Sequence, residues 1–455
     1  MKRTSFLPSE YRAVTGLGLL YAFRMLGLFM VLPVLALYAR DMPGATPFLI
    51  GIALGIYGLT QAILQIPFGM LSDHIGRKQV IALGLLLFFA GSVVAATATT
   101  VEGIIIGRCL QGSGAIAGAL MALLADRTRE EVRTPAMAAI GMSIGVSFAL
   151  AMVIGPLLAQ WFGLSGIFWI TAFLALLGLP ILWRFVPSAP ARRQHQDVGI
   201  DLSRVGALLR RPDLLRLDFS IFCLHALLTG CFVALPLQLE AFGIASRHHG
   251  WIYLPIMAVG FVTMVPLILV AEKYRRVRPV FIGTVTVMGL SLLGMAGVSE
   301  SRSTLYTLLF LFFTGFNLME ALLPSMISKL SPAGAKGSAM GIYSTSQFLG
   351  ASVGGAAGGA ALGAGGPSAL FLMAAALAGV WLLSVLGMKT PPHLSSETVA
   401  LKKPVDADYD RLTRELGAIK GVEDVMVAPA ERVAYLKINR SILDETALNE
   451  FLATR

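Results

Sequence analysis

The chain has 455 residues, of which 56% are hydrophobic and only 14% are charged, and its mean hydropathy is +0.75. A soluble domain carries about 25% charged residues, so this composition excludes an ordinary soluble enzyme, a disordered chain and a fibrous protein. The 36 Lys and Arg residues outnumber the 26 Asp and Glu residues, which gives a net charge of +10. These cations lie in short gaps between apolar runs, so they indicate orientation in a lipid bilayer and no nucleic-acid partner.

The sequence lacks the motifs of a zinc protease and of an ATP-driven pump. The patterns HExxH and GxxxxGK[ST] are both absent. Cys109, Cys223 and Cys231 lie inside apolar runs and form no CxxC pair, which argues against disulfides and against a metal site. We therefore expect a protein that is not an enzyme and that needs no metal or other cofactor.

Twelve apolar runs are long enough to cross a membrane. A bilayer core about 30 Å thick requires roughly 20 helical residues. The first run is too long for a signal-peptide core and contains Arg24, so we expect it to be retained as a span. Breaking the sequence at its polar gaps predicts spans near 14–38, 48–72, 79–98, 101–125, 135–160, 166–186, 216–240, 249–271, 279–298, 304–328, 337–362 and 367–388.

Lysine and arginine residues alternate between the two sides of these spans. One set of loops contains 21 of them, and the opposite set contains only Arg40, Arg247 and Arg302. Because Lys and Arg concentrate in cytoplasmic loops, this asymmetry predicts that both termini lie in the cytoplasm.

The spans form two sets of six. We expect residues 1–186 and 216–389 to form two six-helix halves, joined by a cytoplasmic loop at 187–215. Apolar and charged residues mix between Val198 and Leu209 in this loop. That mixture fits either a basic amphipathic helix on the inner leaflet or a solvated linker.

Short segments recur about 200 residues apart in the two halves. Residues 73–78 resemble residues 272–277, and residues 133–137 resemble residues 336–340. Duplicated halves around a site at the membrane midplane are typical of transporters. The predicted fold class is therefore an all-α membrane protein with twelve transmembrane helices in two halves.

The composition changes after Lys389. Residues 390–455 hold 9 basic and 11 acidic residues and no run of span length. We expect a linker at 390–406 and a domain at 407–455, in the order helix, strand, strand, helix, with a first strand at 398–402. This order predicts a small ferredoxin-like α+β domain in the cytoplasm. Residues 417–422 resemble the heavy-metal-associated domains, but the tail has no cysteine, so the resemblance implies the fold alone.

Three motifs resemble signatures of the major facilitator superfamily. Residues 69–78 read Gly-Met-Leu-Ser-Asp-His-Ile-Gly-Arg-Lys, which matches the signature between helices 2 and 3 at every position. Residues 108–114, Arg-Cys-Leu-Gln-Gly-Ser-Gly, resemble the helix 4 signature. Gly155 and Pro156 resemble the antiporter signature, although the glycines expected after the proline are missing. The resemblance covers residues 10–390, points to the drug/proton antiporters, and implies a multi-pass protein of a bacterial inner membrane.

The resemblance implies a conformational latch on the cytoplasmic side. It places Asp73 against the N-terminus of span 11 and Arg77 against Asp126 at the end of span 4. Gly69 and Gly76 would allow a tight turn and close helix approach, and Lys78 completes the motif. These contacts would close the inner side and favour the outward-facing state. The alternative is that Arg77 and Lys78 only set the topology.

Four ionisable residues lie well inside the spans and are functional candidates for that reason. Glu320 is the first candidate for a proton or cation site, and structural pairing with a basic residue is its alternative. Many drug/proton antiporters carry an acidic residue in helix 1, where this chain has Arg24. Coupling would then depend on Glu320, on Arg108 acting indirectly, or on His225, for which a packing role is the alternative.

A substrate cavity would be lined by polar and aromatic residues on the inward faces of the spans. Several of these residues could equally form hydrogen bonds between helices. The candidates are Tyr57, Gln61, Gln111, Ser143, Tyr253, Asn317, Tyr343 and Gln347.

These features predict a secondary active transporter that exports an unidentified small molecule by alternating access, with protons as its coupling ion and the proton gradient as its energy source. The alternatives are a uniporter and a transporter-like sensor regulated through the C-terminal domain. That domain would bind a ligand or a protein partner.

Overall fold

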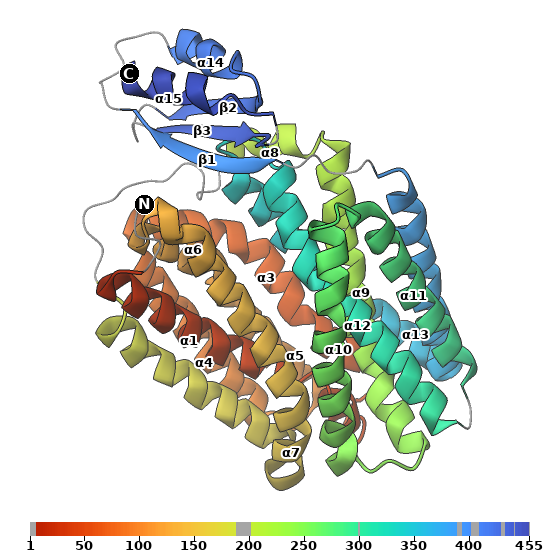
Figure 1. Ribbon diagram of the computed structural model, residues 1–455. Helices are drawn as coiled ribbons and strands as arrows, with labels where there is room; N and C mark the ends of the chain where they lie inside the picture. The colour runs from red at the N-terminus through yellow and green to blue at the C-terminus, as the bar shows by residue number, and fades with distance from the viewer. Residues whose placement is uncertain are drawn as a thin grey trace.

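The computed structural model describes residues 6–187, 202–298, 301–388, 394–401, 409–428, 433–440 and 442–454. Long helices form most of the molecule, and a small α/β domain lies across one end of them (Figure 1). We refer to residues 6–187 as the N-terminal half, residues 202–388 as the C-terminal half, and residues 394–454 as the C-terminal domain. The end of the long helices that faces away from this domain is called the distal end.

Seven helices form the N-terminal half. Pro8 and Pro47 occupy the first turns of α1 and α3, where a missing backbone N–H costs nothing, and Thr46 and Thr100 cap α3 and α5 through their hydroxyl groups. The helices are α1 (Pro8–Met30), α2 (Leu35–Ala39), α3 (Pro47–Ile75), α4 (Arg77–Thr97), α5 (Val101–Ser113), α6 (Ala117–Arg127) and α7 (Glu130–Arg184).

The C-terminal half begins with a short helix and continues with long ones. Its elements are α8 (Leu202–Leu208), α9 (Pro212–Ala241), the 3-10 turn η1 (Ser246–His248), α10 (His249–Glu272), α11 (Val277–Gly297), α12 (Arg302–Leu330) and α13 (Lys336–Leu386). Helix α8 lies within the central loop for which an amphipathic helix was one expectation, and the first part of that segment is outside the described residues.

Ten helices in the described part of the chain are long and apolar enough to cross a membrane. The predicted breaks between spans 5 and 6 and between spans 11 and 12 are kinks and not loops, because α7 and α13 run through them. The backbone leaves helical geometry only at Gly163, with φ 65°, and at Gly365 and Gly366, with φ of −152° and 69°. Glycine tolerates positive φ, which allows such a tight reversal. The 55 residues of α7 and 51 residues of α13 each exceed twice the length of one crossing.

Two predicted spans are interrupted in the structure. The first, expected at 14–38, begins earlier at Pro8 and is broken by turns over residues 31–34 before α2 begins. Pro33 lies in this break, and its ring cannot donate the backbone hydrogen bond that a continuous helix requires. The fourth, expected at 101–125, is divided into α5 and α6 at residues 114–116, where Gly114 lies against the carbonyl group of Gly84.

The C-terminal domain contains a three-stranded sheet and two helices. Its described elements are β1 (Ser395–Ala400), α14 (Tyr409–Gly417), β2 (Val422–Ala428), β3 (Val433–Ile438) and α15 (Glu445–Thr454). The strands pair antiparallel in the order β1-β3-β2, and the first strand lies three residues earlier than predicted. Leu412, Leu416, Leu436 and Leu448 form the core between the sheet and the helices. The ferredoxin-like assignment stays a prediction.

Helix α13 joins the two halves through two glycine faces. Gly350, Gly354 and Gly358 lie against the backbone of α9, and Gly355 and Gly359 lie against the backbone of α3. Any side chain at these positions would overlap a neighbouring backbone. The absence of side chains lets three helices approach backbone to backbone, as small residues do at interfaces in membranes.

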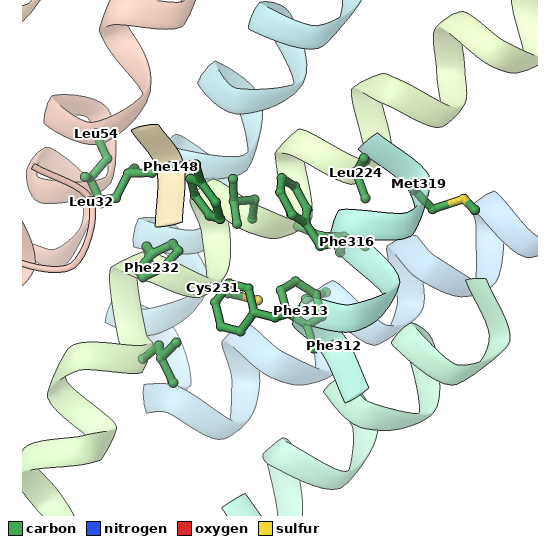
Figure 2. Packing of buried hydrophobic residues seen from close by; sticks show 14 of the residues in the cluster. Leu32, Leu54, Phe148, Leu224, Cys231, Phe232, Phe312, Phe313, Phe316 and Met319 are labelled. Carbon is green, nitrogen blue, oxygen red and sulfur yellow. The ribbon is translucent and has the colours of Figure 1, made fainter. Parts of the chain in front are cut away.

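An apolar and aromatic cluster continues this contact between the halves (Figure 2). Leu32, Leu54 and Phe148 come from the N-terminal half and meet Phe316 and Phe232 of the C-terminal half. The rings of Phe148 and Phe316 lie 5.5 Å apart between centroids. The same cluster extends into the C-terminal half, where helices α9 to α13 all contribute buried residues.

Candidate transport site

A polar cluster lies inside the C-terminal half, where α9, α12 and α13 approach one another. His225 Nε2 is 3.1 Å from Glu320 Oε2 and 2.7 Å from Gln347 Nε2, and the Gln347 amide also donates to Glu320 Oε1 at 3.3 Å. Glu320 lies about ten residues, or about 15 Å, from the end of α12. Three residues that the sequence placed in separate spans thus form one site.

The contact between His225 and Glu320 is a hydrogen bond only when one of the two groups carries a proton. A neutral imidazole nitrogen either donates or accepts a hydrogen bond, so Nε2 cannot do both. When Nε2 is unprotonated, its single lone pair accepts either from the Gln347 amide or from a protonated Glu320 carboxyl group. When Nε2 carries the proton, it donates to Glu320. The proton can therefore reside on either partner.

The cluster faces the N-terminal half and is partly accessible. The Glu320 side chain is 33% exposed and that of His225 is 11% exposed. The Glu320 carboxylate lies within electrostatic range of the hydroxyl groups of Tyr21 on α1 and Tyr343 on α13. The His225 ring packs edge-on against Phe316, 5.8 Å away. The cluster therefore lies beside the contact between the halves, with part of the Glu320 side chain exposed.

Arg24 is the centre of a second polar group, which lies in the N-terminal half. Its Nη2 atom donates to Tyr57 Oη at 3.0 Å and to Gln61 Oε1 at 2.7 Å, and its guanidinium group lies 5.7 Å from the centre of the Phe88 ring. The residue is only 2% exposed. The structure brings together three of the predicted residues, and it places this cation in the half opposite to Glu320.

Each nitrogen atom of the Arg108 guanidinium group has a hydrogen-bond acceptor in its own half. Its nitrogens donate to the backbone carbonyl groups of Ala53 and Leu54 and to Gln111 Oε1, at 3.2–3.3 Å. Gln111 in turn donates to Ser92 Oγ at 2.8 Å. These bonds link α5 to α3 and α4, so they favour a packing role for Arg108 and Gln111.

The remaining predicted cavity residues do not join either polar cluster. Ser143 donates to the carbonyl group of Ile140 in its own helix, and Tyr253 is fully buried against Phe232 and Phe313. Ser143 is also the centre of a Gly-x-Ser-x-Gly pattern, but it lies inside α7 and not at the strand-to-helix turn that exposes a nucleophile.

Asn317 and Tyr343 lie beside the Glu320 cluster and retain unused polar atoms. Asn317 is one helical turn before Glu320 on α12, and the side chains of Asn317 and Tyr343 are buried. Neither the Asn317 Nδ2 atom nor the Tyr343 hydroxyl group has a hydrogen-bond partner among the described residues. Such groups are costly inside a membrane protein unless a ligand or water completes them.

The residues of the loop motif form an ion network within the N-terminal half. Arg77 Nη2 is 2.5 Å from Asp73, its Nε is 3.5 Å from Asp126, and its Nη1 donates to Ser72 Oγ at 2.6 Å. Gly76 has φ 107°, a value that glycine adopts readily, and this conformation permits the abrupt turn between α3 and α4. Lys78 donates to the carbonyl group of Val186 and so ties α4 to the end of α7. Gly69 lies one turn before Asp73 on α3.

The C-terminal half contains a counterpart in which one charge is reversed, and the sequence comparison of the halves shows only part of it. Glu272 at the end of α10 pairs with Lys329 at the end of α12, and Ser325 Oγ donates to Glu272 at 3.2 Å. Glu272 aligns with Asp73 in the repeat, and Lys329 occupies the place of Asp126. Each half therefore ties helix ends together with ion pairs, but a base, Lys329, stands where the N-terminal half has the acid Asp126.

The halves are closed against each other at the distal end. Arg40 Nη1 lies 2.7 Å from Glu240 Oε2 across the two halves, and a side chain at Gly250 of α10 would come within 2.8 Å of the Val153 carbonyl oxygen of α7. Within the N-terminal half, Gly155, which precedes Pro156 in the predicted antiporter motif, packs against the backbone of Met30. The α3–α13 contact at Gly51 and Gly355 completes this closure.

The C-terminal domain is docked on the loop between α12 and α13. Lys437 Nζ donates to the carbonyl oxygens of Ser328, at 2.8 Å, and Lys329, at 3.4 Å, and the residue is only 3% exposed. Asp424 Oδ2 accepts the backbone N–H of Ala333 at 2.8 Å. Ala333 packs against Tyr435 and Met426. One face of the sheet thus packs against helices α14 and α15, and the opposite face packs against this loop.

Comparisons with known proteins agree with this architecture. The model of the Major Facilitator Superfamily matches residues 17–316 and 217–428. The chain is 46% identical to the inner membrane transport protein YajR of Escherichia coli over 97% of both chains. A more distant relative, the multidrug resistance protein MdtH of Aeromonas hydrophila, is 26% identical over 72% of this chain and 82% of its own length.

The fold of a solved transporter is also similar. The nucleoside transporter NupG superimposes with a TM-score of 0.66 at 16% identity, covering 83% of this chain and 98% of NupG. This likeness concerns the fold alone. Together with the family match and the relative of nearly half identity, it shows that the chain is a membrane transporter of the Major Facilitator Superfamily.

Proposed function

We propose that the protein is a proton-coupled secondary transporter that exports a small molecule by alternating access. The observation that carries this proposal is the contact of His225 with Glu320, 3.1 Å apart, with Gln347 within hydrogen-bond distance of both. An ionisable residue inside a membrane is a functional candidate, and a carboxylate and an imidazole in contact form a minimal proton relay. The distant relative named as a multidrug resistance protein supports efflux.

The proposed orientation places both termini and the C-terminal domain in the cytoplasm of a bacterial inner membrane. The 21-to-3 asymmetry of Lys and Arg supports it, as does the relative described as an inner membrane protein. Dividing α7 and α13 at their kinks gives the twelve spans that this orientation requires. The distal end then faces the periplasm, and the closed contacts at Arg40 and Glu240 describe an inward-facing state.

Proton fluxes in proteoliposomes test this function. Purified protein is reconstituted with a pH-sensitive dye inside, and candidate compounds are added to wild type and to Glu320→Gln. The proposal expects a proton flux that is triggered by a compound and lost in Glu320→Gln. Movement of a compound down its gradient without proton flux would support the uniporter alternative instead.

The loop motif is proposed to latch the cytoplasmic side in the outward-facing state. In the structure Asp73 and Asp126 share the cation Arg77, so Asp73 is free to exchange this partner for the N-terminal end of α13 when the halves close there. Asp73→Asn should then favour the inward-facing state. Unchanged transport and unchanged accessibility of cysteines on the cytoplasmic side in Asp73→Asn would exclude a latch and leave the motif a role in topology.

Regulation through the C-terminal domain is a second candidate function, favoured by its docking site. The loop that it covers joins α12, which carries Glu320, to α13, which carries Gln347. A ligand or protein partner that removes the domain from this loop would free both helices at once. Deletion of residues 393–455 tests this: altered transport supports regulation, and unchanged transport leaves the domain an accessory role.

A further inference from the structure

Arg24 is a buried cation whose hydrogen-bonding capacity is mostly unused. Its two bonds, to Tyr57 and Gln61, both come from Nη2. The Nε and Nη1 atoms are buried and have no hydrogen-bond partner in the described part of the chain. A guanidinium group has five N–H donors, so three of them lack an acceptor. Unsatisfied charged donors are costly inside a membrane protein, which makes this group unlike an ordinary structural arginine.

Positive charge accumulates around Arg24 without an acidic partner. Arg24 meets the hydroxyl group of Tyr57, and the guanidinium group of Arg108 lies 5.2 Å from the centre of the same ring. No carboxylate within the described ranges forms an ion pair with either arginine. Arg108 is satisfied by carbonyl oxygens, and Arg24 is not. The interior of the N-terminal half therefore carries two uncompensated cations, one of which has donors to spare.

The Arg24 group lies next to the contact between the halves. The Tyr57 ring packs against Phe348 of α13 at 6.4 Å, and the carbonyl group of Phe348 lies against Gly58. Tyr21, one turn before Arg24, is within electrostatic range of both Arg24 and Glu320. Separation of α3 from α13 would uncover Tyr57 and then Arg24, so the site is closed only while this contact is made.

We propose that Arg24 is the anion-binding group of the substrate site and that the transported class includes organic acids in their ionised form. This proposal rests on the transporter function above and specifies its substrate. The carboxylate or other oxyanion would accept hydrogen bonds from the free Nε and Nη1 donors, on the side of the site opposite to Glu320. The aromatic rings of Phe88, Tyr57 and Phe348 would contact an apolar body attached to the anion.

Binding of three matched probes to the full-length protein in lipid nanodiscs tests this assignment by calorimetry. The probes are 2-naphthoate, its neutral amide 2-naphthamide and the cation 2-naphthylmethylamine. A charge-assisted hydrogen bond should make naphthoate bind about tenfold or more tightly than the amide. Arg24→Gln should reduce this ratio to about one while retaining affinity for the amide. Arg302→Gln, which removes a cation at an exposed distal loop, is the control and should leave the ratio unchanged.

Each other outcome overturns the anion site. These outcomes are equal binding of acid and amide to wild type, a preference that survives in Arg24→Gln, and no binding of the acid. If Arg24→Gln does not fold, Arg24→Lys replaces it, and the ratio should fall but stay above one because the charge remains without the planar fork. Proton flux is measured separately: Glu320-dependent flux without charge preference contradicts the anion site alone, and charge preference without flux contradicts proton coupling alone.

Discussion

His225 and Glu320 lie 95 residues apart in the sequence, and their Nε2 and Oε2 atoms lie 3.1 Å apart in the structure. They come from α9 and α12, and Gln347 of α13 contacts both. The α12–α13 loop, held by the C-terminal domain, joins two of these three helices. The cluster therefore connects the charge that would move during transport to the helices that would move with it.

Replacing His225 with Gln tests whether the pair shares a proton. Glutamine can still donate a hydrogen bond to Glu320, but it cannot take up a proton. We expect proton-coupled transport to fall about tenfold or more in His225→Gln, because one of the two proton positions is lost. Exchange of substrate in the absence of a pH gradient should persist. Both rates are measured in proteoliposomes, and equal loss of both would mean that His225 only supports the fold.

A methyl group at Gly51 should prevent closure of the distal end. The Cβ atom of an alanine there would overlap the carbonyl group of Gly355 on α13. We expect Gly51→Ala to abolish transport and to lengthen the distance between spin labels at Asp41 and Ser246, measured by electron–electron double resonance. Gly283→Ala is the matched control, because nothing lies within 4 Å of the position of its Cβ atom. Equal label distances in both variants would contradict the backbone contact between α3 and α13 at Gly51 and Gly355.

Lys437→Met should loosen the C-terminal domain. The buried ammonium group donates to two carbonyl oxygens at the end of α12, and its loss leaves both without this donor at a cost of about 1–3 kcal/mol. We expect hydrogen exchange in the loop at 331–335 to accelerate about tenfold, as seen by mass spectrometry. Arg440→Gln, which removes an exposed ion pair with Glu397, should leave the exchange unchanged. An equal effect of both variants would argue against a specific docking role for Lys437.

The sequence predicts the membrane architecture well because its signals are local. Apolar runs, charged gaps and the ten-residue loop motif each occupy one stretch of chain, and the structure has a helix at each predicted span. The sequence predicts loops where the structure has kinks at Gly163 and Gly366, because composition shows a glycine-containing gap but not that helical turns resume directly after it. The break at Pro33 lies within a continuous apolar run, so hydropathy alone does not predict it.

The sequence predicts the contacts of the site less well, because these contacts depend on which face each helix turns toward its neighbours. Glu320 and His225 were each identified as buried ionisable residues, but their pairing requires knowing which faces of α9 and α12 meet. The same holds for Arg24, whose neighbours Tyr57 and Gln61 lie one helical turn apart on α3. The base Lys329 in the place of the acid Asp126 hides the symmetry of the halves from a comparison by residue type.

The most direct test of proton coupling is the steady-state accumulation of a transported compound at an imposed pH gradient. A proton-coupled exporter should accumulate the compound above its equilibrium ratio in wild-type proteoliposomes, and the excess should disappear when an ionophore collapses the gradient. Glu320→Gln should equilibrate the compound without accumulating it. Accumulation by Glu320→Gln equal to that of wild type would contradict the role of Glu320, and equilibration by the wild type at every gradient would contradict proton coupling itself.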